Sequence, residues 1–316
     1  MYKQHHLNWQ QPHFKLLCAA SACLLWAAPI IIQLPVNKVL AERPVSQDLE
    51  TASLYQQAVT RYHRHDLAGA ESAFRLALQR EPNLSMARKY LGNIMMQQNR
   101  PDLAVPEYRE ALRINPNLAE AYYNMGLALH QLGDTPGAIN ALRQALVINP
   151  KNALAQYNLG VLLYELGQIQ EAIAAYETAI SLDGSNAQAY FNLAIARQEQ
   201  GEMEQAIAAY QQVVKLDPDN AIAFNNLASL KALQGQNSEA IAIYRQAIRQ
   251  NPNNVLAFYN LGVILYNQGD LTTANTALQR AQKIYEQQGK LQKAQTIEQL
   301  IQEIAELIQQ QRQANR

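Results

Sequence analysis

Residues Ala119–Asn152, AEAYYNMGLALHQLGDTPGAINALRQALVINPKN, decide the fold of this chain. They hold two short segments with apolar residues at helical spacing, separated by Gly133 and ended by Pro150. The next 34 residues read ALAQYNLGVLLYELGQIQEAIAAYETAISLDGSN, and the 34 after those read AQAYFNLAIARQEQGEMEQAIAAYQQVVKLDPDN. A period of this size indicates stacked helix–turn–helix units, so we predict an all-α chain.

Small residues return at the same interval in both helices of each unit. In the first helices they are Ala58, Gly92, Gly126, Gly160, Ala194, Ala228 and Gly262. In the second helices they are Ala70, Ala104, Ala138, Ala172, Ala206, Ala240 and Ala274. We predict that these residues let the two helices of a unit approach closely, because a larger side chain there would overpack the contact at a cost of about 1–3 kcal/mol.

The helix ends carry their own repeating signals. Five glycines are expected to end the first helices in a left-handed turn: Gly133, Gly167, Gly201, Gly235 and Gly269. Four asparagines are expected to cap the first helix that follows them: Asn152, Asn186, Asn220 and Asn254. Prolines follow most second helices, and Gly184 takes the place of one of them.

Two places depart from the pattern. The first unit has Gln57 and Arg61 at usually apolar places, and His65 stands where the turn glycine is expected. Pro106 lies one turn into a second helix, so we expect a late start or a kink there.

The pattern resembles the tetratricopeptide repeat, W-x2-L-G-x2-Y…A-x3-F…A…P. In the third unit its places are taken by Tyr122, Met125, Gly126, Leu129, Ala138, Leu142, Ala145 and Pro150. In the last unit they are taken by Phe258, Leu261, Gly262, Leu265, Ala274, Leu278 and Ala281. Seven such units cover residues 51–288, and the resemblance implies a right-handed α-solenoid of seven helix pairs.

Residues 289–316 follow a different pattern, which we interpret as a C-terminal capping helix. Apolar residues recur at helical spacing: Leu291, Ala294, Ile297, Ile301, Ile304 and Ile308. Such a helix would cover the apolar face of the last unit. Leu300 and Leu307 leave a dimerising coiled coil open as the alternative, although the segment is shorter than three to four heptads.

Residues 1–41 have the composition of a signal peptide or a membrane anchor. Lys3 and Lys15 precede an apolar run over residues 16–34, and Val39 and Ala41 offer small residues for cleavage. The run is also close to the ~20 residues that span a bilayer, so a retained anchor is the alternative. We therefore expect a protein that is exported or attached to a membrane through its N-terminal helix, with residues 42–50 as a linker.

The composition argues against several classes of function. After residue 41 there are 23 basic and 26 acidic residues, so we expect no nucleic-acid partner. There is no G-x-x-x-x-G-K, G-x-S-x-G or H-E-x-x-H motif in the sequence. His63 and His65 are two residues apart and do not share a helix face. We expect a protein that is not an enzyme, with no metal site and no cofactor.

An asparagine column marks the candidate binding surface: Asn124, Asn158, Asn192, Asn226 and Asn260. The resemblance implies that the first helices line the concave face, where similar asparagine ladders hold extended peptides in some relatives. A carboxamide both donates and accepts hydrogen bonds, so it suits a peptide backbone. Local bonding within the array is the alternative.

An aromatic column stands beside it: Tyr55, Tyr123, Tyr157, Phe191 and Tyr259. Together with Val161, Ile195 and Val263 one turn on, it predicts a groove for a peptide or helix with apolar side chains. The alternative is that part of this column packs between units, because aromatic residues often fill cores.

Lys89, Asn93 and Asn124 have the spacing of half a carboxylate clamp, which grips a terminal carboxylate in chaperone-cofactor relatives. Leu154 and Asn158 stand where the other half needs basic residues, so the clamp is expected to be incomplete. We interpret the chain as a non-catalytic scaffold that binds a protein or peptide segment in the concave groove. The alternative is a membrane-anchored accessory or assembly factor for an envelope or membrane protein complex.

Overall fold

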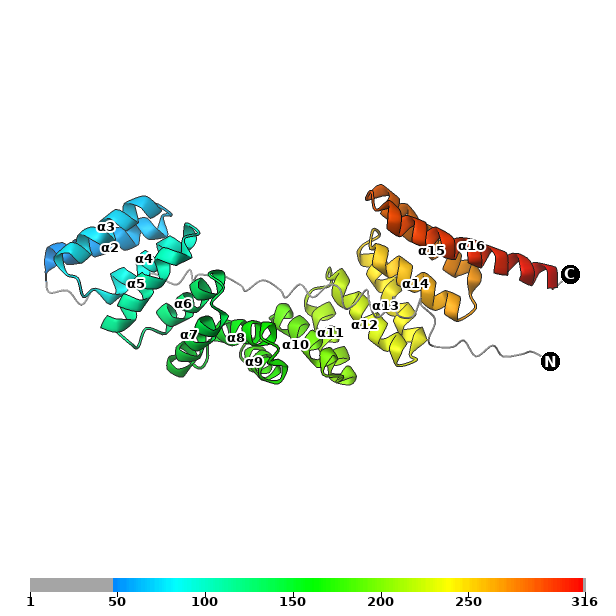
Figure 1. Ribbon diagram of the computed structural model, residues 1–316, viewed down its shortest axis with the longest axis horizontal. Coiled ribbons are helices and arrows are strands. Elements are labelled where there is room, and N and C mark those ends of the chain that lie inside the picture. Colours follow the sequence, from blue (N-terminus) through cyan, green and yellow to red (C-terminus); the bar gives the residue numbers. More distant parts are fainter. Residues whose placement is uncertain (1–47, 315–316) are drawn as a thin grey trace. The chain divides into compact units, whose positions relative to one another are not determined.

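The computed structural model describes residues 48–314, and every regular element among them is an α-helix (Figure 1). The predicted signal or anchor, residues 1–41, lies outside the described residues. The helix pairs are α2 (Leu49–His63) with α3 (Leu67–Arg80), α4 (Ser85–Gln97) with α5 (Pro101–Ile114), α6 (Ala119–Gln131) with α7 (Thr135–Ile148), α8 (Ala153–Glu165) with α9 (Ile169–Leu182), α10 (Ala187–Glu199) with α11 (Met203–Leu216), α12 (Ala221–Leu233) with α13 (Asn237–Gln250), and α14 (Val255–Asn267) with α15 (Leu271–Gln287). A last helix, α16 (Leu291–Ala314), follows them.

The described residues divide into two compact units, residues 48–184 with α2–α9 and residues 185–314 with α10–α16. Within each unit the two helices of a pair pack along one another, as α14 and α15 do in the orange part of Figure 1. The chain is therefore an all-α solenoid of helix pairs, as the 34-residue period predicts.

The small residues of the first helices lie directly against the second helices. A Cβ atom built on Gly160 would stand 2.6 Å from Cε1 of Tyr176, and one on Gly92 would stand 2.5 Å from Cε1 of Tyr108. The alanine column of the second helices is fully buried at every place. The prediction of close helix approach is therefore confirmed, and these contacts leave no room for a larger side chain.

The predicted helix ends are confirmed as well. The side-chain oxygens of Asn152, Asn186, Asn220 and Asn254 each accept a hydrogen bond from the backbone N–H three residues later. The turn glycines have positive φ, and His65 and Asn99 take the same conformation in the first two units, with φ of 59° and 57°. The prediction of a late start at Pro106 is wrong, because α5 begins at Pro101, in register with the other second helices. Pro106 lies inside this helix although it has no backbone N–H to donate.

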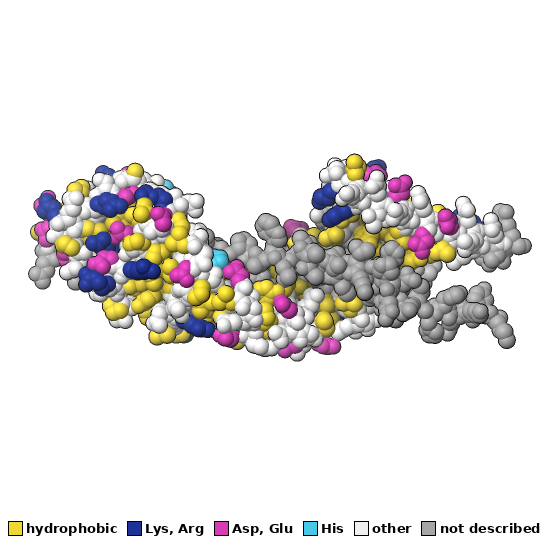
Figure 2. Space-filling view, viewed as in Figure 1, with side chains coloured by type: hydrophobic (Ala, Val, Ile, Leu, Met, Phe, Trp, Pro, Cys, Tyr) yellow, Lys and Arg dark blue, Asp and Glu magenta, His cyan; other side chains and the backbone are white. Residues whose placement is uncertain are grey.

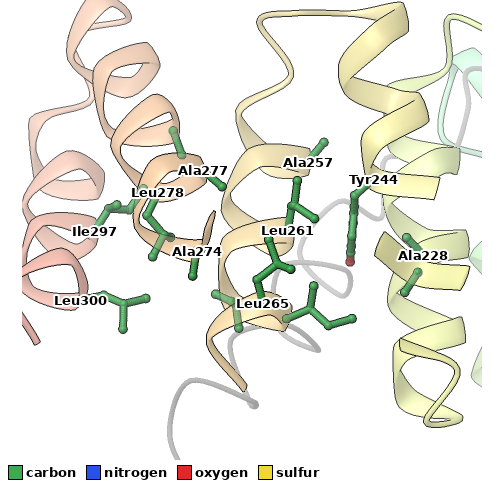
Figure 3. Packing of buried hydrophobic residues seen from close by; sticks show 14 of the residues in the cluster. Ala228, Tyr244, Ala257, Leu261, Leu265, Ala274, Ala277, Leu278, Ile297 and Leu300 are labelled. Atoms are coloured by element: carbon green, nitrogen blue, oxygen red, sulfur yellow. The ribbon is translucent and has the colours of Figure 1, made fainter. Parts of the chain in front are cut away.

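Helix α16 packs against α15 and closes the core of the second unit (Figure 3). Its buried residues are Ala294, Ile297, Leu300 and Ile304, and they join a cluster that includes Tyr244, Leu261 and Leu278. Leu307 packs against the same cluster and is partly buried. Leu300 and Leu307, on which the coiled-coil alternative rests, therefore already have contacts within the chain, whereas Leu291 at the start of α16 is 64% exposed and covers nothing. Among the helices of residues 48–314, none combines the length and the apolar character needed to cross a bilayer.

Candidate functional site

The five asparagines of the predicted column, called the asparagine ladder from here on, occupy equivalent places in their helices. Each is the sixth residue of a first helix, in α6, α8, α10, α12 and α14, and each is at least 92% buried. Buried carboxamides need hydrogen-bond partners, because an unsatisfied polar group loses its bonds to water without replacement. Their partners therefore show how the ladder is held.

In the first compact unit each ladder amide donates to the preceding repeat. Nδ2 of Asn124 lies 2.8 Å from Oδ1 of Asn93, and Nδ2 of Asn158 lies 3.0 Å from the hydroxyl oxygen of Tyr123. These bonds join α4 to α6 and α6 to α8, so the ladder takes part in holding successive first helices together. The alternative interpretation, local bonding within the array, therefore accounts for the NH2 groups of Asn124 and Asn158.

The second compact unit uses other partners. Nδ2 of Asn226 donates to the hydroxyl oxygen of Tyr210 over 3.0 Å, and Nδ2 of Asn260 lies 3.5 Å from Oδ1 of Asn225. Asn192 differs again, because its Oδ1 accepts a hydrogen bond of 3.4 Å from Nε2 of Gln188. The repeating sequence position is therefore served by a different hydrogen bond in each repeat.

The carboxamide oxygens of several ladder asparagines lack a hydrogen-bond partner among the described residues. The Oδ1 atoms of Asn124, Asn158 and Asn260 are buried and have no hydrogen-bond partner within residues 48–314. Leaving such an acceptor unpaired costs about 1–3 kcal/mol. A donor group brought by a ligand, such as a peptide N–H, would remove that cost.

The aromatic column is largely packed within the array. Tyr123, Tyr157 and Phe191 are buried, whereas Tyr259 is only partly buried. The ring of Tyr157 lies 6.2 Å from that of Tyr176, and the ring of Phe191 lies 5.9 Å from that of Tyr210 in an edge-to-face contact. Burial raises the pKa of Tyr123 well above the usual value for tyrosine.

One turn after the aromatic positions of their own helices, Val161 and Val263 are buried and Ile195 is partly buried. Part of the aromatic column therefore fills contacts between helices, as the packing alternative states, and Tyr259 has the most exposed ring of the predicted column.

Lys89, Asn93 and Asn124 come together in one polar cluster. Nζ of Lys89 lies 2.9 Å from Oε2 of Glu120, and Oδ1 of Asn93 accepts hydrogen bonds of 2.8 Å from both Tyr108 and Asn124. Lys89 is 97% buried, so its ammonium group is paired inside the array. The other half of a carboxylate clamp would need two basic residues, and those positions are occupied by Leu154, which is partly buried, and Asn158.

Sequence reasoning missed Glu120 as a member of this cluster. It lies four residues before Asn124 on α6, so the two share a helix face, and this spacing was the available signal. The charge of Glu120 also reaches the tyrosines around it. The pKa of Tyr62 is raised to about 12, mainly by burial and to a smaller extent by the carboxylate of Glu120. The pKa of Tyr108 is raised well above its usual range, first by burial and then by the nearby Tyr62 and Glu120.

Residues 48–314 contain no group of three or more His, Cys, Asp or Glu side chains placed to hold a metal ion. The first helices offer hydrogen bonding by carboxamides, apolar contact by aromatic rings, and the ion pair between the buried Lys89 and the partly exposed Glu120.

Four models of the tetratricopeptide repeat match the chain. They match residues 157–221, then 92–133, 126–167 and 230–269, then 209–242, and finally 256–287. Together they cover residues 92–287 without a break, which is more than half of the 316-residue chain. Comparison with curated proteins gave no match.

Solved structures share the fold. A C-terminal part of a TPR repeat-containing protein from Cytophaga hutchinsonii is 16% identical, with a TM-score of 0.66, covering 76% of this chain and 98% of that one. YrrB, described as a TPR protein with an unusual peptide-binding site, is 24% identical, with a TM-score of 0.55, covering 60% of this chain and 98% of that one. The MamA protein is 26% identical, with a TM-score of 0.50, covering 54% of this chain and 93% of that one.

Proposed function

Because the chain belongs to the tetratricopeptide repeat family, which serves as a scaffold for protein–protein interaction, we propose that it is a non-catalytic scaffold whose first helices bind an extended segment of a partner protein. The partner segment lies along the asparagine ladder and the neighbouring aromatic residues. Affinity comes from backbone hydrogen bonds to the ladder and from apolar side chains beside it.

One observation carries this proposal. The carboxamide oxygens of Asn124, Asn158 and Asn260 are buried and without a hydrogen-bond partner among the described residues, at the same place in three repeats. An unsatisfied acceptor that recurs with the repeat calls for an explanation in terms of a ligand or water. A peptide backbone offers N–H donors at regular intervals, and it meets these oxygens without a requirement for particular side chains.

The test begins with identification of the partner. Residues 42–316 are used for affinity capture followed by mass spectrometry, and binding of the captured protein is then measured with variants at Asn124, Asn158 and Asn260, each changed to Ala. Each hydrogen bond contributes about 0.5–1.5 kcal/mol net, so single variants should weaken binding modestly and the triple variant strongly.

A matched control separates loss of binding from loss of fold. Asn140→Ala and Gln211→Ala remove exposed amides from the second helices α7 and α11 and should leave binding unchanged. Circular dichroism must show that the triple ladder variant is folded. If it is folded and binds the captured partner as tightly as the parent, the ladder is purely structural and the proposal fails.

The apolar run at residues 16–34 favours a second candidate. With that segment retained in a bilayer, the array would act as a membrane-anchored accessory or assembly factor for an envelope or membrane complex. With the segment removed, the scaffold would work in an extracytoplasmic compartment. Both versions use the same binding face and differ only in what residues 1–41 do.

A further inference from the structure

We propose that Asn225 and Asn260 form a binding site for the primary carboxamide of a Gln or Asn side chain in the partner segment. The site lies within the second compact unit, on the first helices α12 and α14. It rests on the proposed function, because it selects one side chain of the segment that the first helices bind.

Asn225 interrupts the aromatic column. The equivalent residues of the neighbouring repeats are Phe191 and Tyr259, and Ser229, one turn further along α12, stands where the next repeat has Val263. Both polar side chains of α12 are nevertheless buried. A buried polar group in place of an apolar one costs stability unless it finds a partner, so the hydrogen bonds of these residues show whether the change serves the fold.

Ser229 has its partner within the array. Its hydroxyl oxygen lies 3.0 Å from that of Tyr244 on α13, which is the red atom of Tyr244 in Figure 3. Asn226, the ladder residue of α12, is held by Tyr210 on α11. These two polar side chains of α12 therefore contribute to the packing of the helices around them.

Asn225 serves the fold less well than a tyrosine would. In the first unit the equivalent pair is Tyr123 and Asn158, and Nδ2 of Asn158 donates to the tyrosine hydroxyl over 3.0 Å. In the second unit Nδ2 of Asn260 lies 3.5 Å from Oδ1 of Asn225, beyond the usual range of about 2.7–3.2 Å. The contact between successive first helices thus does not explain an asparagine at residue 225.

Asn225 and Asn260 leave one donor and one acceptor unused. Nδ2 of Asn225 and Oδ1 of Asn260 are buried and have no hydrogen-bond partner among residues 48–314. Exchanging nitrogen and oxygen in both side chains would keep their mutual contact and still leave one NH2 group and one oxygen unpaired. Such a pair of buried groups calls for a ligand or a water molecule that both accepts and donates.

A primary carboxamide matches this pair. Its oxygen accepts from Nδ2 of Asn225 and its NH2 group donates to Oδ1 of Asn260, so one neutral group satisfies both atoms. An ionised side chain is disfavoured, because no residue of the site carries a charge to pair with it. On the face drawn in Figure 2, the Lys, Arg, Asp and Glu side chains lie at the surface, where water solvates them. An apolar side chain is disfavoured too, since it leaves both atoms unpaired.

Selection from a peptide library tests the class of ligand. Phage-displayed random peptides are selected on residues 42–316, which contain every helix from α2 to α16, as the parent sequence and as Asn225→Tyr. The variant restores the pair that Tyr123 and Asn158 form, so it should remain folded. Peptides selected on the parent should carry Gln or Asn at one fixed position, and those selected on the variant should not.

Synthetic peptides then measure the contribution of the fixed residue. Its replacement by the corresponding acid or by Leu should weaken binding to the parent at least about tenfold, because a site built to hydrogen-bond a group rejects analogues that lack it. With Asn225→Tyr the same replacements should change binding less than about threefold, since the coupled partner is gone. Gln211→Ala, which removes an exposed amide from α11, is the matched control and should bind every peptide as the parent does.

Two kinds of failure are distinguishable. If the parent selects peptides without a fixed Gln or Asn, or binds the acid and Leu versions equally well, water alone serves the two atoms and this proposal is overturned, while the peptide-binding face stands. If the parent selects no peptide at all, the proposed function fails together with it. Should circular dichroism show that Asn225→Tyr is unfolded, Asn225→Leu takes its place in both measurements.

Discussion

The side-chain amide of Asn158 donates a hydrogen bond of 3.0 Å to the hydroxyl oxygen of Tyr123, across the boundary between two successive repeats. Asn158 belongs to the asparagine column and Tyr123 to the aromatic column. The sequence suggests two separate contributions to a groove, but the structure joins them in one hydrogen bond between α6 and α8. A change at either residue therefore affects the stability of the array as well as its surface.

The bond itself gives the first prediction. Asn158→Ala should lower the free energy of unfolding by about 1–3 kcal/mol, because it removes a buried hydrogen-bond donor from the contact between two repeats. Asn140→Ala, at an exposed place on α7, should change it by less than about 0.5 kcal/mol. Urea denaturation followed by circular dichroism measures both, and equal stabilities for the two variants would contradict the structural role of the bond.

A second prediction concerns the close approach of paired helices. Gly160→Ala should destabilise the array by about 1–3 kcal/mol, since the new Cβ would stand 2.6 Å from the ring of Tyr176, and Gly160→Leu should cost more. Gly126→Ala should cost less, because its Cβ would be farther from its neighbours, 3.1 Å from Cγ of Leu142 and 3.2 Å from the backbone oxygen of Ala138.

The loss from Gly160→Leu should extend beyond one helix pair, because neighbouring repeats stabilise one another. Hydrogen exchange should therefore speed up in α6 and α7 as well as in α8 and α9. A melting curve that matched the parent's would show that the packing assignment is wrong.

Gly184 gives a third prediction. It forms the turn between α9 and α10 at the place where Pro150 stands in the turn between α7 and α8, and a Cβ at residue 184 would come no nearer than 3.8 Å to any other group. Gly184→Pro should therefore stabilise the protein by about 0.4–1 kcal/mol, because the unfolded chain loses conformational freedom. Pro150→Gly should do the reverse. Thermal unfolding of both variants checks the pair, and a destabilising Gly184→Pro would refute the equivalence of the turns.

The buried tyrosines predict a loss of stability at high pH. Burial raises the pKa of Tyr244 from 10.0 to about 12, and burial with the carboxylate of Glu303 does the same for Tyr266. Because the folded state holds these protons more tightly, their contribution to stability is complete below pH 10 and is lost as the pH rises from about 10 to about 12.

Absorbance at 295 nm should then show tyrosine ionisation that coincides with the loss of helical circular dichroism above pH 10. Tyr244→Phe should remove part of this pH dependence. Ionisation of all tyrosines near pH 10 in a chain that stays helical would contradict the prediction.

Residues 1–41 give the last prediction. If they are a signal that is removed, the mature N-terminus is Glu42, and the protein is recovered in the soluble fraction. N-terminal sequencing of the protein from its own host, together with fractionation, measures this. Met1 or Tyr2 found at the N-terminus of a membrane-bound protein would replace the signal with an anchor.

The sequence predicted the positions of most residues of the candidate site, but it did not predict their hydrogen-bond partners. The column at Asn124 and Asn158 follows from the repeat, because equivalent positions in stacked units lie on equivalent helix faces. Whether an amide at such a position meets a tyrosine, another asparagine or no partner depends on side chains about 31 to 35 residues away, which differ between repeats. The unsatisfied oxygens of the ladder could not be foreseen for the same reason.

The sequence by itself determined the helix pairs, their ends and their close contacts. Asn152 caps α8, Gly133 ends α6, and Gly160 admits the ring of Tyr176, because capping, left-handed turns and small-residue contacts depend on residues near in sequence or on a strict period. Only the tertiary structure decided that Lys89 is paired with Glu120. That pairing requires two helices of different repeats to bring an ammonium and a carboxylate within 2.9 Å, with the lysine side chain almost fully buried, and no local pattern encodes such a meeting.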